Sequence, residues 1–428
     1  MTEIRKSFLQ GPIAYSPSPI KVRWLRLWIF FFILTLAAIS PVDSQSGYRA
    51  VKKGAKPILT LQDANHPAIS ADGRLIAVGP EIGVTEVYEV ATGRKLHTFR
   101  IPRSYSQAIS ADGKRIAVFA RKITGYEGSN YSSEVEMWVF DAVSGKEIRR
   151  TNTKILHKGE VLGEMSVFQE RGKLSRNISS DLRFMANDPK YEENPPPDKH
   201  GILLGDVETH ELVRGFGGYN MPGYWHNLKL TPDARRLAAA WSYEKDRQTV
   251  VWDVESGREL LKLPFDCWWL VLSDDGKRLV TVHRDSGSGE TAAFSVTAEG
   301  EVRVESVEGK AKTEERESLL RAQAWDIATG RRISEIGAQF GNKRRPMVWG
   351  ALSPDGKLFV TSSHENMLLW DVDTGRLLAE QPIVEPQRHD FKTVLFSGDG
   401  RYIAMSSWDE IVKVFRVEDL LRDAGVSK

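Results

Sequence analysis

Short stretches of alternating apolar and polar residues recur along the chain and predict β-strands, whereas stretches with a helical period are almost absent. Successive stretches flank a compact polar turn of the pattern Ser-x-Asp-Gly. This turn recurs as ISADG at 69–73, ISADG at 109–113, ISSDL at 178–182, LTPDA at 230–234, LSDDG at 272–276, LSPDG at 352–356 and FSGDG at 396–400. Self-similarity of this kind predicts a repeat architecture rather than a series of unrelated domains.

A second polar turn follows each of the first six. It recurs as YEVATG at 88–93, FDAVSG at 140–145, GDVETH at 205–210, WDVESG at 252–257, WDIATG at 325–330 and WDVDTG at 370–375, with a weaker FRVED at 415–419. In both turns an Asp side chain can accept backbone N–H bonds, and Gly supplies a positive φ. Each repeat therefore predicts four short strands, one on either side of each turn.

The recurring residues of these turns are periodic, so we interpret them as structural rather than as carboxylates for chemistry. They are Asp72, Asp112, Asp181, Asp233, Asp275, Asp355 and Asp399 of the first turn and Trp252, Trp325 and Trp370 of the second.

The two turns resemble those of the WD40 family of β-propellers, over roughly residues 57–420. The Trp-Asp pair is intact at 252–253, 325–326 and 370–371, and nearly so at 140–141, whereas the family's Gly-His dipeptide is missing. The resemblance is to a divergent bacterial WD40-like protein. It implies an all-β fold, a seven-bladed β-propeller of four-stranded antiparallel blades.

A closed ring requires a fourth strand in the last blade. The last repeat supplies three convincing strands, and residues 57–62 have the pattern of a fourth. We predict that 57–62 completes the last blade, which ties the two ends of the ring together and removes an open sheet edge. Residues 421–428 are expected to form a tail.

A hydrophobic N-terminal segment precedes the repeats. Residues 1–26 are basic, and residues 27–39 form the apolar run LWIFFFILTLAAI, with a small polar stretch to 46. This pattern indicates an export signal with positive charge held inside. Two interpretations stay open: a cleaved signal peptide, which gives a secreted or periplasmic protein, or an uncleaved membrane anchor with the propeller on the extracytoplasmic side.

The extra length of the repeats falls on one face. Because strands alternate in direction, both polar turns emerge on one side, which we call the short-turn face. Connections between the second and third strands, and between blades, emerge on the other side, the variable face. This face holds the inserts 121–133, 187–200 and 284–320. The insert 284–320 is expected to form an extra hairpin around Glu299 and Gly300. Insertions confined to one face are typical of a binding face, with neutral drift as the alternative.

Candidate partner-binding residues come from this face: Trp225, His226, Lys343, Arg344, Arg345 and Trp408. Each has a simpler interpretation as loop packing or as a solvated surface charge. Trp268, Trp269 and Trp349 are interpreted as core residues. Cys267 is interpreted as a buried small hydrophobe.

Composition narrows the function classes. The 428 residues carry a net charge of +2, but residues 1–50 hold six basic and two acidic residues, so the repeats are close to neutral. A neutral body gives no reason to expect nucleic acid as a partner. A single cysteine excludes an intramolecular disulfide. No motif predicts a catalytic site, a metal or a cofactor, although His283, His364 and Asp188 fall near strand ends on the variable face.

We therefore expect a non-enzymatic protein-interaction platform, a monomeric propeller that is exported or tethered to a membrane. The alternative is an enzyme or small-ligand binder of the lactonase, dehydrogenase or lyase kind, with its site at the channel mouth. Fold alone does not choose between these classes.

Overall fold

The computed structural model describes residues 54–127, 130–157, 160–164, 177–187, 201–217, 224–243, 246–284, 290–296, 302–308, 320–337, 349–362, 366–382, 391–407 and 409–426. The chain divides into two compact units, residues 1–50 and 51–428, and the described residues all belong to the second. The predicted basic segment 1–26 and the apolar segment 27–46 lie outside them. Within the described part of the chain, no helix has both the length and the apolar character needed to cross a membrane.

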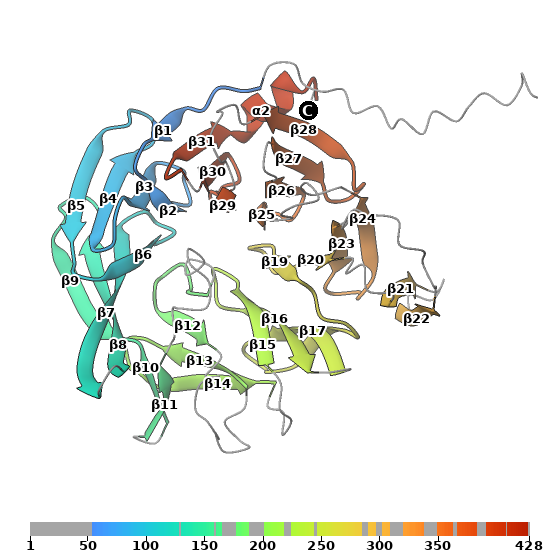
Figure 1. Ribbon diagram of the computed structural model, residues 1–428, viewed down its shortest axis with the longest axis horizontal. Helices are drawn as coiled ribbons and strands as arrows, with labels where there is room; N and C mark the ends of the chain where they lie inside the picture. The colour runs from blue at the N-terminus through green and yellow to red at the C-terminus, as the bar shows by residue number, and fades with distance from the viewer. Residues whose placement is uncertain are drawn as a thin grey trace, which may run out of the picture. The chain divides into compact units, whose positions relative to one another are not determined.

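Seven antiparallel sheets form a ring around a central axis (Figure 1), so the predicted seven-bladed propeller is confirmed. In each blade the first strand lies nearest the axis. Blade 1 comprises β2 (Asn65–Ile69), β3 (Leu75–Gly79), β4 (Val84–Glu89) and β5 (Lys95–Arg100). Blade 2 comprises β6 (Ser104–Ile109), β7 (Arg115–Glu127), β8 (Asn130–Asp141) and β9 (Glu147–Asn152).

Blades 4, 5 and 6 have the same strand order as the first two. Blade 4 comprises β15 (Tyr224–Leu230), β16 (Arg236–Tyr243), β17 (Asp246–Asp253) and β18 (Glu259–Leu263). Blade 5 comprises β19 (Trp269–Leu272), β20 (Arg278–Arg284), β23 (Leu320–Asp326) and β24 (Arg332–Gly337). Blade 6 comprises β25 (Trp349–Leu352), β26 (Leu358–Ser362), β27 (Asn366–Asp371) and β28 (Leu377–Pro382).

Blade 3 has a reduced innermost strand. Its named strands are β12 (Phe184–Asn187), β13 (Ile202–Asp206) and β14 (Leu212–Phe216). Ile178 occupies the innermost position and pairs with Met185 through a single bridge. The turn ISSDL has Leu182 in place of the glycine, with a positive φ of 62°, as blade 4 has Ala234 with a φ of 55°.

Blade 7 is closed by the N-terminal strand. It comprises β29 (Phe391–Phe396), β30 (Tyr402–Ser407), β31 (Val412–Arg416) and β1 (Leu59–Leu61). β1 pairs antiparallel with β31, with Leu59 opposite Val414 and Leu61 opposite Val412. The strand predicted from residues 57–62 therefore completes the last blade, and the two ends of the ring are joined by backbone hydrogen bonds.

One helix was not expected from the sequence. α2 (Val417–Asp423) follows β31 directly. Its residues Val417, Leu420 and Leu421 are buried in the apolar cluster between blades 6 and 7. These three positions lie on one helix face, but the stretch is too short for its period to stand out against the strand that precedes it. The predicted tail at 421–428 thus begins inside a helix.

The core consists of apolar clusters, one at each boundary between neighbouring blades. Because side chains of a strand alternate between its two faces, each blade contributes one set of residues to each neighbour. The second and third strands are buried on both faces, as in β16, where Leu237, Ala238 and Ala239 are all fully buried.

Candidate functional site

Within the part of the chain that the structure describes, three β-hairpins extend connections of the variable face. β7 and β8 stay paired beyond the length of their blade, from Arg115 opposite Asp141 to Glu127 opposite Asn130. The insert predicted at 121–133 is therefore a continuation of two blade strands rather than a loop. By contrast, the corresponding pairing in blade 6 ends after Ser362 opposite Met367.

The other two hairpins pair within themselves. β21 (Glu290–Val296) and β22 (Val302–Glu308) form an antiparallel pair between β20 and β23, which confirms the hairpin expected around Glu299 and Gly300. β10 (Lys154–His157) and β11 (Glu160–Glu164) pair between blades 2 and 3, where the sequence predicted only a connection. The insert 187–200 lies outside the described residues except for Asn187, which ends β12.

Trp225 lies in the core. Its side chain is 1% exposed, and its Nε1 donates to the Gly217 carbonyl at 3.0 Å. The ring centroid lies 5.2 Å from that of Trp241 and 5.1 Å from that of Trp252. In this structure Trp225 therefore offers almost no surface to a partner, and the packing interpretation applies to it.

A β-bulge follows Trp225 in β15. The pairing with β16 shifts between His226 and Lys229, and Asn227 has a φ of 57°. The Asn227 amide donates to the Trp268 carbonyl at 3.0 Å, which holds the bulge against blade 5, and it lies 2.7 Å from His226 Nδ1. His226 is half-buried beside this bulge.

Of the two tryptophans Trp225 and Trp268, Trp268 is exposed and Trp225 is buried. Trp268 is 54% exposed, whereas its neighbour Trp269 is 2% exposed and packs against Phe359 of blade 6. The core interpretation of the pair thus applies to Trp269, and for Trp268 it is wrong. The side chains of Lys343, Arg344, Arg345, Trp349 and Trp408 lie outside the described residues, as do those of Asp188 and His364.

The buried titratable groups near this face favour neutral forms. Burial lowers the pKa of His283 to about 4, and the nearby Asp266 carboxylate only partly opposes this effect. Burial also raises the pKa of Cys267 to about 12, so the thiol stays protonated near pH 7. Within the described ranges no three His, Cys, Asp or Glu side chains lie close enough to hold a metal ion.

On the short-turn face, the first turn has the same geometry from blade to blade. In blade 1 the Ser70 hydroxyl donates to Asp72 Oδ1 at 2.6 Å, and the same oxygen accepts the Arg74 N–H at 3.0 Å. Gly73 takes a φ of 68°. Burial acts to raise the pKa of Asp72, but the two hydrogen bonds and the Arg74 charge outweigh it, so the pKa lies below its ordinary value. Through these bonds the Asp72 carboxylate stabilises its own turn.

Two tryptophans of the second turn, Trp325 and Trp370, have hydrogen-bond partners that the sequence did not identify. Trp325 Nε1 donates to the Thr281 hydroxyl at 3.0 Å, and Trp370 Nε1 donates to the Thr361 hydroxyl at 3.1 Å. Both threonines are fully buried on the second strand of the same blade. The sequence signal for these partners is a Thr at the same place in the second strand of blades 5 and 6. It is easily missed, because Thr is also an ordinary residue of an apolar strand.

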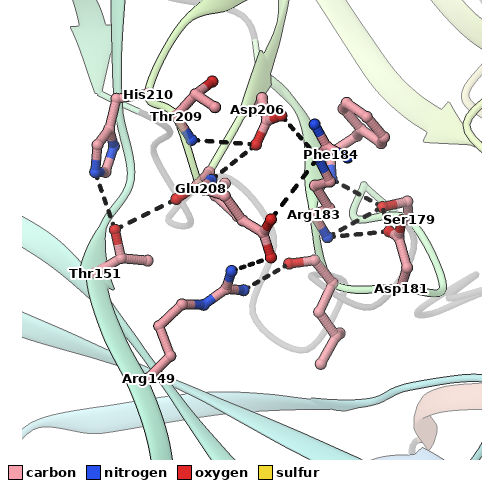
Figure 2. A network of polar contacts seen from close by, with 12 residues as sticks. Arg149, Thr151, Ser179, Asp181, Arg183, Phe184, Asp206, Glu208, Thr209 and His210 are labelled. Carbon is pink, nitrogen blue, oxygen red and sulfur yellow. Dashed lines mark hydrogen bonds and ion pairs between the residues drawn. The ribbon is translucent and has the colours of Figure 1, made fainter.

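A polar network joins blades 2 and 3 near their outer strands (Figure 2). Arg149 of β9 contacts the Glu208 carboxylate, and its guanidinium also donates to the Leu182 carbonyl at 3.4 Å. Arg183 Nε lies 2.7 Å from Asp206 and 3.9 Å from Glu208.

A second contact across the same boundary involves a strained histidine. His210 has a φ of 62° at the turn position that glycine fills in blades 1, 2, 4, 5 and 6. Figure 2 shows its ring directed at Thr151 of β9, and Nε2 lies 3.0 Å from the Thr151 hydroxyl. A non-glycine residue in this conformation costs about 1 kcal/mol, so it persists where other contacts offset the strain.

Comparison with solved structures supports the fold. The chain matches 1415 chains of solved structures, so the architecture is common and does not select a function. One is Kuenenia stuttgartiensis hydrazine synthase, with 14% sequence identity, a TM-score of 0.51, and coverage of 87% of this chain and 98% of that chain. The chain is a seven-bladed β-propeller. At this identity the likeness shows the fold alone. No protein-family model matches the sequence, and no curated protein matches it.

Proposed function

We propose that the chain is a non-enzymatic protein-interaction platform, a divergent WD40-like propeller that binds a protein partner on its variable face. The observation that carries this proposal is the placement of the hairpins. The extension of β7 and β8, the β10–β11 hairpin and the β21–β22 hairpin all arise at connections of that face. Paired strands that extend beyond the blades form an ordered surface. Loop insertions that accumulate by neutral drift need not be ordered in this way.

Exposed apolar side chains on the same face add to the argument. Ile82, in the connection between β3 and β4, is 80% exposed, and Trp268 is 54% exposed. Large aromatic side chains at such positions are typical anchors of protein interfaces. The Trp268 backbone is fixed by the Asn227 amide, so little further order is lost when a partner covers the side chain.

The experiment compares the two faces with matched variants. The full-length tagged protein is crosslinked in its host, and the captured proteins are identified by mass spectrometry. Ile82→Ser and Trp268→Ser test the variable face. Val143→Ser is the control, because Val143 is 78% exposed and belongs to a turn of the short-turn face.

A second set of variants removes hairpins without disturbing the blades. Arg284 pairs with Leu320, so residues 285–319 can be replaced by Asn-Gly as a two-residue turn. Lys122 pairs with Glu134, so residues 123–133 can be replaced in the same way. We expect one stoichiometric partner to be lost in at least one variable-face variant and kept by Val143→Ser. A partner kept by every variable-face variant, or lost only in Val143→Ser, would contradict the proposal.

We further propose that residues 27–39 direct export or form a membrane tether, with the propeller on the extracytoplasmic side. The apolar run behind basic residues supports this proposal. A fusion of alkaline phosphatase to the C-terminus tests it, because that enzyme becomes active only after export. Active fusion is expected. Activity that survives replacement of Phe30, Phe31 and Phe32 by Asp would show that another route places the propeller outside.

A further inference from the structure

His283 stands where two segments of the variable face meet, at the boundary between blades 4 and 5. It lies near the end of β20, one residue before the last strand pair that precedes the insert 285–319. Its half-buried ring packs edge-on against Phe265, with the ring centroids 4.9 Å apart. Phe265 belongs to the connection 264–268, which joins β18 to β19 and ends at the exposed Trp268. A movement of this ring therefore affects both the segment that carries Trp268 and the root of the β21–β22 hairpin.

A chain of hydrogen bonds assigns the proton on the His283 ring. Trp325 Nε1 can only donate, and it donates to the Thr281 hydroxyl at 3.0 Å. The same hydroxyl lies 3.0 Å from His283 Nε2 and has one hydrogen of its own to donate. Among the described residues, Nε2 is the acceptor within reach of that hydrogen. Nε2 therefore accepts, and the neutral ring carries its proton on Nδ1.

Protonation of the ring removes this arrangement. Both nitrogens of an imidazolium carry hydrogens, so His283 Nε2 can no longer accept a hydrogen bond. The Thr281 hydrogen then needs another acceptor, and Thr281 is fully buried, where an unsatisfied donor is costly. The neutral ring therefore fits the closed boundary, whereas the imidazolium favours a form in which the ring has left Thr281.

The charged groups around the ring do not offset this cost. The anion that acts on the ring is Asp266, but it already accepts a hydrogen bond from Ser242 and lies 3.5 Å from Arg247 Nη1. Burial outweighs the attraction of Asp266 and lowers the pKa of His283 to about 4 from its ordinary 6.5. Further titratable residues on the strands and the connection around the ring include His226 and Lys229 of β15, Cys267, Arg284 of β20, and Arg321 of β23, which lies opposite His283.

We propose that His283 is a pH-sensitive switch of the variable face. Protonation breaks the contact with Thr281 and loosens the connection 264–268 together with the root of the insert 285–319. The pKa of the ring is about 4 in the closed form, whereas an open form with a solvated ring has the ordinary pKa of 6.5. As the pH falls between these values, the ratio of open to closed molecules should rise by up to about tenfold per pH unit.

The consequence of the switch for binding rests on the proposed function. In the open form Trp268 loses the fixed backbone that makes it a suitable anchor, so a protein partner should be held less tightly in mildly acidic solution. The opening itself needs no partner, so it can be measured on the protein alone.

Hydrogen exchange of the full-length protein in mild detergent tests the switch. Protection factors are measured by mass spectrometry from about pH 7 to about pH 4.5, with the intrinsic exchange rate of each amide removed. We expect peptides that cover 264–272 and 278–284 to lose protection by up to about tenfold per pH unit below about pH 6.5. The matched control is β26 of blade 6, where Thr361 also accepts from a tryptophan but Ser363 stands at the position of His283.

Variants show whether His283 is the group that titrates. His283→Gln offers Thr281 an acceptor without charge, and His283→Phe keeps a ring against Phe265; both should abolish the pH dependence of the two segments. His97→Gln is the control, because His97 is half-buried near the short-turn face, with Nε2 3.0 Å from the Ala142 carbonyl. It should leave the wild-type pH dependence of both segments in place. Melting curves confirm that each variant is folded.

Two results would overturn the proposal. One is wild-type protection in both segments that changes with pH no more than in β26, and this result decides alone if neither variant folds. The other is a folded His283→Gln or His283→Phe variant with the wild-type pH dependence.

Capture of the partner is measured separately. A partner captured at about pH 7.5 should be released at about pH 5.5 by the wild type and kept by His283→Gln. Equal release by both would overturn the link between the switch and binding. Failure to capture any partner at about pH 7.5 would contradict the proposed function, while the exchange measurements would still decide the switch.

Discussion

Two neighbouring blade boundaries are held together by different physical means. Between blades 3 and 4 the contact is aromatic: Trp252 of blade 4 lies 5.9 Å from Phe216 of blade 3 and 5.1 Å from Trp225 of its own blade, measured between ring centroids. Between blades 2 and 3 the second turn has Gly205 where Trp252 stands in blade 4. That boundary instead adds the polar network of Arg149, Glu208 and His210 to its apolar cluster.

The difference shows how a repeat tolerates the loss of its main packing residue. A buried tryptophan contributes a large area of apolar contact that is insensitive to salt and pH. Exposed ion pairs contribute little and are screened by salt. The boundary between blades 2 and 3 should therefore respond to solution conditions more than the boundary between blades 3 and 4. The predictions below test this comparison, beginning with the largest expected effect.

Removal of the aromatic anchor should have the largest effect. Trp252 is 2% exposed, and Trp252→Ala leaves a cavity that the rigid strands cannot fill. We expect a loss of about 3–5 kcal/mol in the free energy of unfolding. Urea unfolding followed by circular dichroism measures it. Trp268→Ala is the control, because the exposed Trp268 should change stability by less than about 0.5 kcal/mol. Similar losses in both variants would contradict the aromatic account.

The comparison can also be tested through the backbone of the second turn, at its positive-φ position in blades 6 and 3. In blade 6 a Cβ on Gly375 would lie 2.4 Å from the Glu335 carbonyl oxygen of blade 5, and φ is 68°. Gly375→Ala should therefore cost about 2 kcal/mol or more in thermal or urea unfolding. His210→Gly makes the opposite change in blade 3. It relieves about 1 kcal/mol of strain and loses a contact of similar worth, so a net change below about 1 kcal/mol is expected. A larger loss for His210→Gly than for Gly375→Ala would reverse our interpretation of the two turns.

The fold was predictable from the sequence because its signals are local and repeated. A turn motif such as Ser70 to Gly73 needs only the chemistry of its own residues, and seven copies reinforce one another. The closing strand at Leu59–Leu61 followed from a missing fourth strand. In contrast, α2 depends on burial of Leu420 and Leu421 against blade 6, which no local pattern reports.

The candidate sites were less predictable because exposure depends on neighbours from other blades. Trp225 and Trp268 are both tryptophans near the variable face, yet one is buried against Trp241 and the other is exposed. The sequence gives no measure of this difference. A cavity at the short-turn end of the central axis is similar, because its lining comes from every blade and only closure of the ring brings those residues together.

Acid should weaken, through Asp206, the second turn of blade 3, which presents Glu208 and His210 to blade 2. Burial acts to raise the pKa of Asp206, but the Glu208 N–H, the Arg183 guanidinium and the Thr209 N–H together hold it below its ordinary value. The unfolded chain therefore binds more protons as the pH falls below about 4, and stability falls with it. Asp206→Asn should cost about 1 kcal/mol at neutral pH and flatten this dependence.

Urea midpoints measured from about pH 6 to about pH 3 provide the check. Other turn aspartates, such as Asp112, also have a lowered pKa, because the Ser110 hydroxyl and the Lys114 N–H donate to the carboxylate. Asp112→Asn is therefore the comparison variant in blade 2. An Asp206→Asn profile parallel to the wild type would show that the Asp206 carboxylate does not titrate with unfolding.

The smallest expected effect belongs to the ion pair across the boundary. Arg149 and Glu208 are 25% and 41% exposed, so Arg149→Met should cost about 0.5 kcal/mol at low salt. A double-mutant cycle with Glu208→Gln isolates the coupling, which should vanish near 1 M NaCl, where the screening length is about 3 Å. Lys95 and Glu86 form a pair within blade 1 at 2.6 Å and serve as the control cycle. Salt should weaken the coupling energy of both pairs. Because the Arg149 pair alone of these two crosses a blade boundary, its cycle reports the salt dependence of that boundary. If the Arg149 coupling survives high salt, the contact acts as a hydrogen bond rather than as a screened charge pair, and the two boundaries differ less in their response to salt than we expect.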